Sequence, residues 1–330
     1  SASAAAAAML NVFAEVDKYT LQTPIDRLKF DLCVQATEMW PNFLLEMQES
    51  IDTSKYPVPS FGKSEIGFGT YVINNTATDA LEDINYQEIA NALKAYNQDF
   101  IEIDPTLVPN YKPSAQLRAT RSLFIAGEGW VNPKIVLYEF ECALKSDSRI
   151  SFVNSDVSLL TVDSRNNLSS VTTTDGNHFS ADKYLIANGA SLTQLLSNSH
   201  VDLPVQDVFY GVGLSLEIST GNNNHSNCVR TPNRGLACGI YTAPYQASDN
   251  CKNIIIGASN FISPKPYAHA RLASFEGLLN GAIRQINSDF YRADFISYNV
   301  GWRPTSQDTY PLVGKTSISN LFIASGTKRD

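Results

Sequence analysis

Cysteine is scarce in this sequence, and its five residues fall in no pattern that metal or disulfide chemistry requires. They are scattered, and no two of them form a C-x-x-C pair: Cys33, Cys142, Cys228, Cys238 and Cys251. Neither a disulfide framework nor a zinc site is therefore indicated. Reduced thiols are typical of a cytoplasmic protein, which is the location that we expect.

Histidine is equally sparse, and its four residues are isolated from one another: His178, His200, His225 and His269. None lies at the spacing of a metal-binding motif, and no G-x-S-x-G nucleophile motif is present. The sequence therefore predicts no metal site and no serine hydrolase chemistry.

Basic clusters and long apolar runs are also lacking. Asp and Glu outnumber Lys and Arg by 33 to 25, which leaves a net charge of −8. Because a nucleic-acid surface needs clustered Lys and Arg, no nucleic-acid partner is expected. The longest apolar runs, such as "NIIIGAS" and "NLFIASG", are far shorter than the ~20 residues of a spanning helix. No membrane span is predicted.

The 330 residues, 43% of them hydrophobic, are enough for two domains with buried cores. "PKIVLYEFECALKSDSRISFV" (133–153) has apolar residues at helical spacing followed by a β-rich run, which predicts a helix and then a strand. Residues 158–190 predict a strand, a hairpin with a D-G turn, and a short buried strand. Residues 205–300 combine strands with an amphipathic helix near 270–290, which is α+β behaviour.

The alanine run at residues 4–8 has two interpretations. Alanine has the best intrinsic helix propensity, so the run is suited to the opening of a helix. Small residues also let the backbone approach a flat ring closely, so the run is equally suited to packing around a ligand.

Several segments, taken in order, resemble the FAD-dependent amino acid and amine oxidases of the D-amino acid oxidase and glycine oxidase type. The most specific is "GWRPTSQDTYPLVGKTSISNLFIASGTK", in which G-x-R-P is followed by D-x-x-P-x-x-G, a strand and a glycine turn. Weaker matches are "SASAAAAAMLNVFAEVD", "WVNPKIVLYEFECAL", "KYLIANGASLTQLL" and "CGIYTAPYQASDNCKNIIIGAS". The resemblance covers most of the chain.

The resemblance implies an α/β FAD-binding domain, Rossmann-like and of the glutathione-reductase type, with an α+β substrate domain built on an antiparallel sheet. It places the FAD-binding domain at 1–40, 126–204 and 296–330, and the substrate domain at 41–125 and 205–295. Enzymes of this type open with a G-x-G-x-x-G turn that admits the pyrophosphate. That motif is absent here, and we expect the chain to begin after it.

FAD contacts are expected by carry-over from the family. They fall on the N-terminal loop, on the backbone of one strand residue, on the "ANGA" turn and on the last glycine turn: Ser1, Ala2, Ser3, Ala4, Ala5, Val157, Asn188, Gly189, Ala190, Gly326, Thr327 and Lys328. Backbone amides near Gly326 would approach the flavin where negative charge develops on reduction. Lys328 has two interpretations, as added positive charge near the flavin or as a solvated surface residue.

Arg303 is the expected binder of the substrate carboxylate, because a guanidinium matches a carboxylate through two parallel charge-assisted hydrogen bonds. The alternative is a structural arginine paired with an acid such as Asp308. Tyr241 and Tyr245 are four residues apart, so in a strand both would point to one face and could reach the pocket. Their alternative role is packing in the core, and packing is also the role expected of Trp302 and Tyr310.

The implied function is oxidation of a C–N bond in an amino acid or another carboxylate-bearing amine, by hydride transfer to the flavin. The partner is a small-molecule amine, and O2 is one candidate electron acceptor. The closing "TKRD" differs from the common family ending, which leaves oxidase and dehydrogenase both open. Alternatives are an N-demethylating enzyme like sarcosine oxidase and a non-catalytic subunit or scaffold with the same fold.

Overall fold

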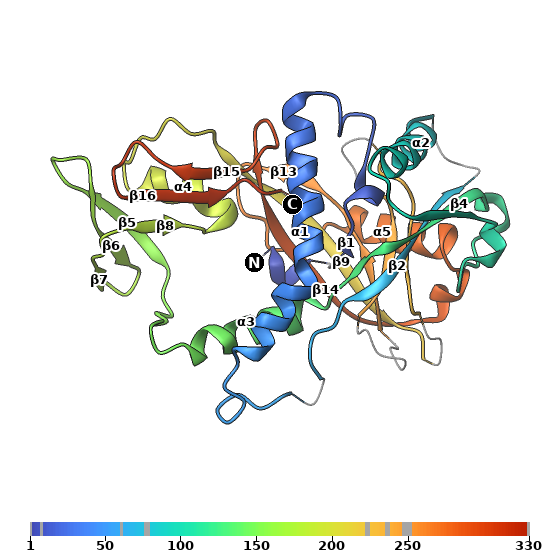
Figure 1. The fold of residues 1–330 in the computed structure, drawn as a ribbon, viewed down its shortest axis with the longest axis horizontal. Coiled ribbons are helices and arrows are strands. Elements are labelled where there is room, and N and C mark those ends of the chain that lie inside the picture. The colour runs from blue at the N-terminus through green and yellow to red at the C-terminus, as the bar shows by residue number, and fades with distance from the viewer. Residues whose placement is uncertain are drawn as a thin grey trace.

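The structure is a computed structural model, and it describes residues 2–6, 9–59, 62–75, 80–221, 225–234, 238–245 and 253–328. Of the residues expected to contact FAD, Ser1 lies outside this part. Two regions are seen in Figure 1: a large mixed sheet with helices at its sides, and a smaller region of two three-stranded sheets. Helix α1 (Pro24–Glu49) stands between them.

The large sheet runs in the order β1-β4-β2-β10-β11-β12-β9-β13, with β3 on β4 and β14 on β9. Only the β10 and β2 pair is parallel among these described strands. The bounds are β1 (Met9–Leu10), β2 (Gly67–Asn75), β3 (Phe100–Ile103), β4 (Ala119–Trp130), β9 (Val208–Ser219), β10 (Cys228–Arg230), β11 (Tyr241–Pro244), β12 (Asn253–Gly257), β13 (Phe261–Ser263) and β14 (Asp294–Ser306).

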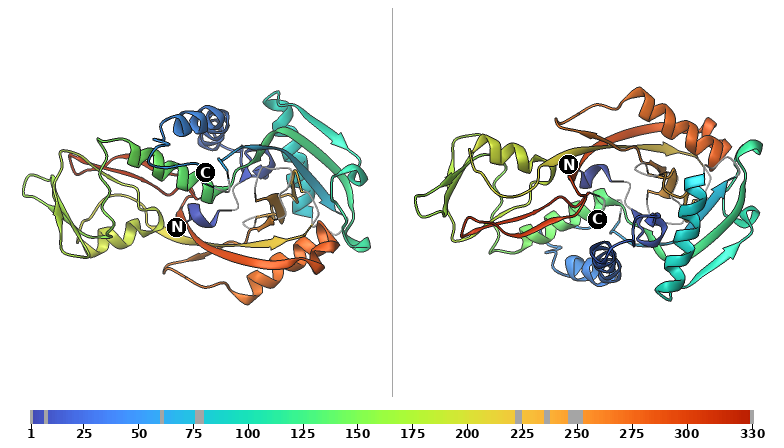
Figure 2. Two further views of the ribbon diagram at one scale, coloured as in Figure 1. Left: turned by 90° about the horizontal axis from the view of Figure 1, so that it is seen from below. Right: turned by 90° about the horizontal axis from the view of Figure 1, so that it is seen from above.

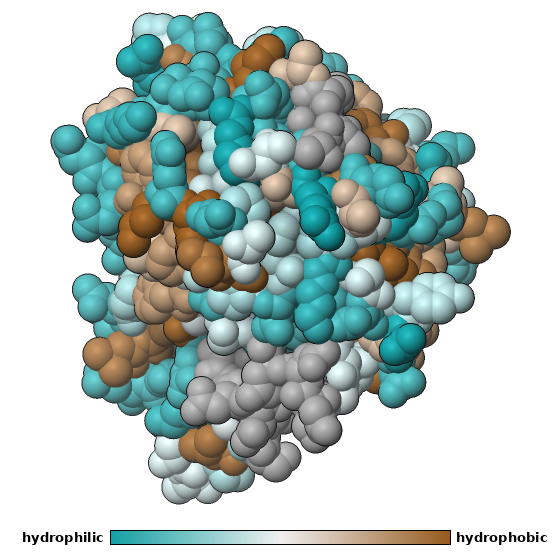
Figure 3. Space-filling view, turned by 90° about the vertical axis from the view of Figure 1, so that its right-hand side faces the viewer, coloured by the Kyte–Doolittle hydropathy of each residue, from teal (hydrophilic) through white to brown (hydrophobic). Residues whose placement is uncertain are grey.

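Two helices pack on this sheet through apolar side chains. Helix α2 (Ala80–Ala95) places Ile89 and Leu93 in a core with residues of β2 and β4. Helix α5 (Leu272–Gln285) lies along β9 and β12, where Leu278 and Ala282 are buried. The helix expected near 270–290 is thus confirmed. On the face shown in Figure 3, hydrophobic side chains form separate patches among hydrophilic ones, as is usual for a protein surface.

The smaller region contains a sheet of order β15-β16-β8 and a meander of order β5-β6-β7. Its strands pack on helix α4 around Leu192 and Leu321. The bounds are β5 (Val157–Val162), β6 (Leu168–Thr173), β7 (His178–Phe179), β8 (Tyr184–Ile186), α4 (Leu192–Asn198), β15 (Leu312–Lys315) and β16 (Leu321–Ser325). Strands β8 and β16 are parallel.

One element of the predicted order is wrong. Helix α3 (Pro133–Ser146) forms as expected, but residues 150–154 after it form no strand. The hydrophobic residues there, Ile150, Phe152 and Val153, are 39–51% exposed. A β-rich run becomes a strand only where another strand bonds to it, and no described strand pairs with this segment.

The short helix η1 (Ser3–Ala5) and the end of β16 both lie beside β14. Gly301 allows this approach, because a Cβ there would crowd Ala2 and Ala5. On the other side, the backbone N–H of Lys328 donates to the carbonyl of Pro304 at 2.7 Å. Figure 2 shows both ends of the chain at this junction. The domain boundaries drawn from the sequence stay a prediction.

Candidate active site

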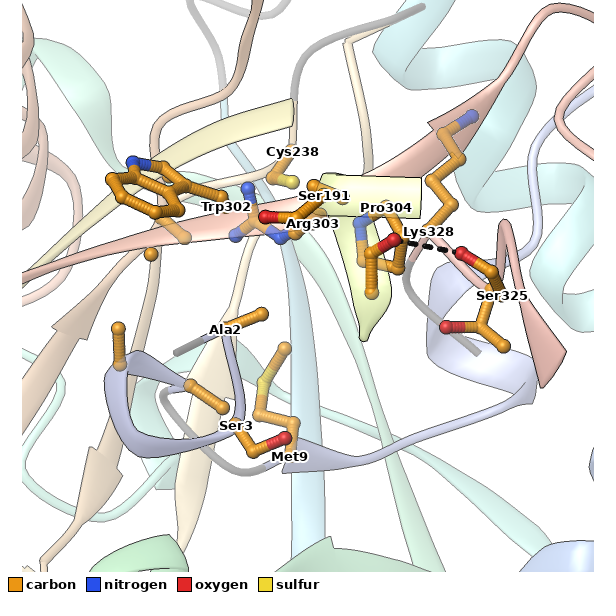
Figure 4. A pocket seen from close by; sticks show the side chains of 18 of the residues that line it. Ala2, Ser3, Met9, Ser191, Cys238, Trp302, Arg303, Pro304, Ser325 and Lys328 are labelled. Carbon is orange, nitrogen blue, oxygen red and sulfur yellow. Dashed lines mark hydrogen bonds between the residues drawn. The ribbon is translucent and has the colours of Figure 1, made fainter. Parts of the chain in front are cut away.

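A cavity of about 720 Å³ lies where η1, the turn after β8, strand β14 and the end of β16 meet (Figure 4). Most of the residues expected to contact FAD line it: Ala2, Ser3, Ala5, Asn188, Gly189, Ala190, Thr327 and Lys328. Of the expected substrate-binding residues, Arg303 and Tyr241 line it as well. The structure therefore brings together segments that are far apart in the sequence.

The cavity lies at the carboxyl ends of two parallel strands. Ala187 follows the last residue of β8, and Ser325 is the last residue of β16. The Ser325 hydroxyl donates to the Gly189 carbonyl at 2.9 Å and so ties the two ends together. Ligands of open α/β sheets bind at such strand ends, and the small side chains here leave room for a flat ring.

Three of the expected FAD contacts do not line this cavity: Ala4, Val157 and Gly326. Val157 begins β5 in the outlying hairpin, and its side chain is 40% exposed. Gly326 has a φ of +72° and turns toward Leu312 and the Tyr310 carbonyl, while its neighbours Ser325 and Thr327 face the cavity. A glycine serves this turn because other residues rarely adopt a positive φ.

Arg303 projects from β14 across the neighbouring strand β9. Its guanidinium lies over Gly213, where any Cβ would collide with it. Nη1 donates to the Ser259 carbonyl at 3.1 Å and to Asn260 Oδ1 at 3.3 Å. No carboxylate pairs with Arg303 in the part of the chain that the structure describes. Figure 4 shows the side chain among the lining residues.

The alternative partner of Arg303 is wrong. Asp308 instead accepts hydrogen bonds from the Gln206 side chain and from the backbone of Tyr310. Those contacts lie in the turn after β14, so Asp308 stabilises the turn rather than the guanidinium.

Tyr241 begins β11, and its ring covers Gly257 on the adjacent strand. The side chain is buried, and burial raises the pKa of Tyr241, with Cys238 acting in the same direction and Arg303 opposing it. The hydroxyl therefore stays protonated and can donate a hydrogen bond.

Tyr245 departs from the expectation that it shares this pocket. It comes after the last residue of β11, so the alternation of the strand no longer directs its side chain. It packs in the apolar cluster of Tyr241 and Met9, with the Lys134 ammonium 5.3 Å from its ring centre. It is not among the residues that line the cavity.

Packing is the role that the sequence predicts for Trp302, and its ring does pack edge-on to Tyr210, with the ring centres 5.7 Å apart. It also lines the cavity, and its indole N–H donates to the Tyr267 carbonyl at 2.9 Å. The position next to Arg303 carried no sequence signal for this second role, because neighbours in a strand normally face opposite sides.

Glu15, which the sequence reasoning missed, also lines the cavity. It forms an ion pair with Arg230, whose side chain is fully buried in β10. Asn233 donates to Glu15 Oε2 at 2.9 Å and to its carbonyl oxygen at 2.9 Å. No local motif signals this pair, because its members are 215 residues apart in the sequence.

The backbone just before Glu15 is held by a buried carboxylate. Glu128 of β4 accepts hydrogen bonds from the backbone N–H groups of Val12, Phe13 and Ala14. Burial raises the pKa of Glu128 to about 7, although these three donors oppose the shift. Glu128 thus positions the loop that carries Glu15.

The described residues offer neither a metal centre nor a membrane-spanning helix. They contain no group of three or more His, Cys, Asp or Glu side chains placed to hold a metal ion. They also contain no helix with the length and apolar character needed to cross a membrane.

Comparison with known proteins identifies the family. The family model described as FAD dependent oxidoreductase matches residues 1–330. A D-amino acid dehydrogenase from Vibrio atlanticus is 26% identical over 159 residues, which are 48% of this chain and 35% of that protein. The chain thus matches about a third of the length of this curated relative.

Two solved structures share the fold. The glycine oxidase from Geobacillus kaustophilus superposes with a TM-score of 0.75 at 21% identity, covering 99% of this chain and 80% of the other. The iminodiacetate oxidase from Chelativorans sp. BNC1 superposes with a TM-score of 0.76 at 18% identity, with the same two coverages. The predicted fold class is confirmed. Because the family model spans its whole sequence, this chain belongs to the FAD-dependent oxidoreductases.

Proposed function

We propose that this protein oxidises a C–N bond of an amino acid or another amine that carries a carboxylate. The observation that supports this most directly is the Arg303 guanidinium, which lines the cavity and has no acidic partner among the described residues. The relatives are consistent with it, since the names glycine oxidase, iminodiacetate oxidase and D-amino acid dehydrogenase all denote substrates with an amine and a carboxylate.

FAD is the cofactor of the family to which the chain belongs. The cavity fits it, because Gly189, Ala190 and Ala2 leave a wall of small side chains at the ends of β8 and β16. These residues and Thr327 would hold the ring system, and Lys328 would add positive charge beside it. When bound, FAD supplies the acceptor for the hydride that leaves the substrate.

Arg303 would fix the substrate by its carboxylate. The Arg303 guanidinium is half-buried, and a carboxylate that enters the cavity would form both an ion pair and two aligned hydrogen bonds with it. Gly213 leaves the space that this orientation needs. With one end held, the carbon bearing the amine is positioned against the ring, which is the main contribution of binding to rate.

Tyr241 and Trp302 would complete the substrate side of the cavity. The protonated Tyr241 hydroxyl can donate to the second carboxylate oxygen, and both rings exclude water. The reaction also needs an electron acceptor. We propose O2 as one candidate, and oxygen uptake compared with dye reduction would distinguish oxidase from dehydrogenase activity.

Replacement of Arg303 tests the proposal. In Arg303→Ala, we expect kcat/KM for amino acids to fall about 10- to 100-fold or more, because a charge-assisted hydrogen-bond partner is lost. FAD content, measured by visible absorbance, should not change. Gly213→Ala should cause part of the same loss, because it displaces the guanidinium without removing its charge.

The matched control is Arg149→Ala, which removes an exposed arginine paired only locally with Asp147. It should leave kcat/KM unchanged. If Arg303→Ala and Arg149→Ala have the same kcat/KM as the unchanged protein, the proposed carboxylate site is wrong.

A further inference from the structure

We propose that Glu15 binds a cationic nitrogen of the substrate, so that the cavity selects amino acids over simple carboxylic acids. This inference rests on the proposed function of Arg303. It adds a second, oppositely charged contact in the same cavity, and it makes Arg230 a positioning residue for that contact.

The first argument is the placement of Glu15. Its side chain lines the same cavity as Arg303 and is 25% exposed, whereas its partner Arg230 is fully buried. Of this ion pair, only the carboxylate can therefore reach a ligand. The backbone that carries it is held from two directions, by Glu128 before it and by Asn233 at its own carbonyl.

The second argument concerns charge. A fully buried guanidinium requires an ionised partner, since an unpaired buried charge is strongly destabilising. Arg230 donates to Glu15 Oε1, and Asn233 donates to Oε2. These donors keep Glu15 anionic and fix the orientation of its carboxylate. Each carboxylate oxygen can accept more than one hydrogen bond, so a ligand N–H can be bound in addition.

The third argument is that Glu15 and Arg303 act on a common group. Both influence the ionisation of Tyr241, Glu15 by raising the pKa of its hydroxyl and Arg303 by lowering it. An anion and a cation therefore both lie near this buried ring, and all three residues line the one cavity. A zwitterion, with a carboxylate and an ammonium group, complements such a pair. A simple carboxylate satisfies only Arg303.

The experiment compares the FAD-loaded protein with its Glu15→Gln variant. Glutamine keeps the size of the side chain and an oxygen for Arg230, but removes the negative charge. We expect KM for amino acids to rise about 10- to 100-fold, the effect of one charge-assisted hydrogen bond. The inhibition constant of propionate, which has no nitrogen, should stay within about twofold, since it needs only Arg303. Glu102→Gln, on the exposed face of β3, is the control for loss of one charge.

The choice of substrate identifies the nitrogen. Equal losses for D-alanine and D-lysine assign the contact to the amine next to the carboxylate, and a loss for D-lysine alone assigns it to the distal amine. An unchanged KM for both amino acids overturns the inference. An equally large rise in the inhibition constant of propionate also overturns it, because it would show that Glu15 only maintains the structure.

Two further measurements keep the test independent of folding and of the first proposal. If Glu15→Gln loses FAD, Glu15→Asp replaces it: the shorter carboxylate keeps the charge beside Arg230, and the preference for D-alanine over propionate should still fall. An unchanged preference in that variant overturns the inference. Arg303→Ala should weaken the binding of D-alanine and of propionate together. If it does so while Glu15→Gln has no effect, only the Glu15 contact is wrong.

Discussion

At the scale of single residues, the charged groups of the cavity are held in different ways. Arg303 is anchored by neutral oxygens, Ser259 O and Asn260 Oδ1, and so keeps its full charge for a ligand. Glu15 is anchored by a buried cation and so has part of its charge balanced. Two glycines on adjacent strands leave the room that Arg303 and Tyr241 occupy, Gly213 on β9 and Gly257 on β12.

A site residue can be predicted from the sequence where its type matches one chemistry. It cannot be predicted where its role depends on a contact between distant parts of the chain. Arg303 follows from its motif and reaches the cavity. Glu15 also reaches the cavity, but it follows from no motif, because its partner Arg230 is 215 residues away. Strand alternation predicts that Tyr245 shares the face of Tyr241, but β11 ends at Pro244, one residue before it.

The burial of Glu128 leads us to expect that the stability of the protein depends on pH. Its pKa is raised from 4.5 to about 7 by burial, so between these values the folded state binds more protons than the unfolded state. The contribution of Glu128 to the free energy of unfolding must then fall as pH rises from about 4.5 to 7. Glu128→Gln removes this dependence, and an amide oxygen can still accept from the backbone of Val12 to Ala14.

The measurement is the thermal midpoint of both proteins across this pH range. The advantage of the original over the Glu128→Gln variant should shrink steadily as pH rises. Taking the difference cancels the contribution of His225, whose pKa is lowered to about 4 by burial and which acts with the opposite sign. A difference that is constant with pH would contradict the prediction.

At the scale of elements, local signals explain where the helices begin. Helix α1 starts with a capping box, in which Thr23 Oγ1 accepts from the Asp26 N–H and Asp26 Oδ2 accepts from the Thr23 N–H, with Pro24 as the first helical residue. Asn132 caps α3 by accepting from the backbone N–H groups of Lys134 and Ile135, and its amide also donates to the Tyr245 carbonyl. Such signals are readable from sequence because they involve residues close in the chain.

Strand prediction depends on more distant partners. The run at 150–153 has the composition of a strand but no described partner, whereas "NIIIG" lies between β11 and β9 and forms β12. Composition indicates that a segment can be a strand. Only the neighbouring strands decide whether it becomes one.

The cap of α1 gives an element-scale prediction. Thr23→Ala removes the side-chain acceptor, and we expect a loss of about 1 kcal/mol in the free energy of unfolding, measured by chemical denaturation. The control on the same helix is Thr37→Ala, whose hydroxyl donates only to the Cys33 carbonyl one turn earlier. That change should be neutral or slightly stabilising. Equal losses in both variants would show that the cap contributes nothing.

At the scale of the whole molecule, the fold class was predictable because the closing segment of the chain carries a long, specific pattern. The cavity itself was predictable only in part. Its walls come from η1, the turn after β8, β14 and the end of β16, and the way these elements meet depends on packing such as that of Gly301 against Ala2 and Ala5.

This arrangement predicts that FAD stabilises the whole protein. A ligand that binds only the folded state at 100 times its dissociation constant adds about 2.7 kcal/mol to the free energy of unfolding. The thermal midpoint of the FAD-free protein should therefore rise with FAD concentration. AMP, which lacks the flavin ring, is the control and should have a much smaller effect. A midpoint independent of FAD would argue against the cavity as its site.

The long-range contacts that hold residues 12–15 also affect how the protein folds. Val12 is bound by a side chain 116 residues further along, and Glu15 by one 215 residues further along. Contacts between such distant positions form slowly, because the intervening chain must first be brought to order. A nascent polypeptide thus acquires its ligand-binding ability only at the end of folding, when β4 and β10 are both in place.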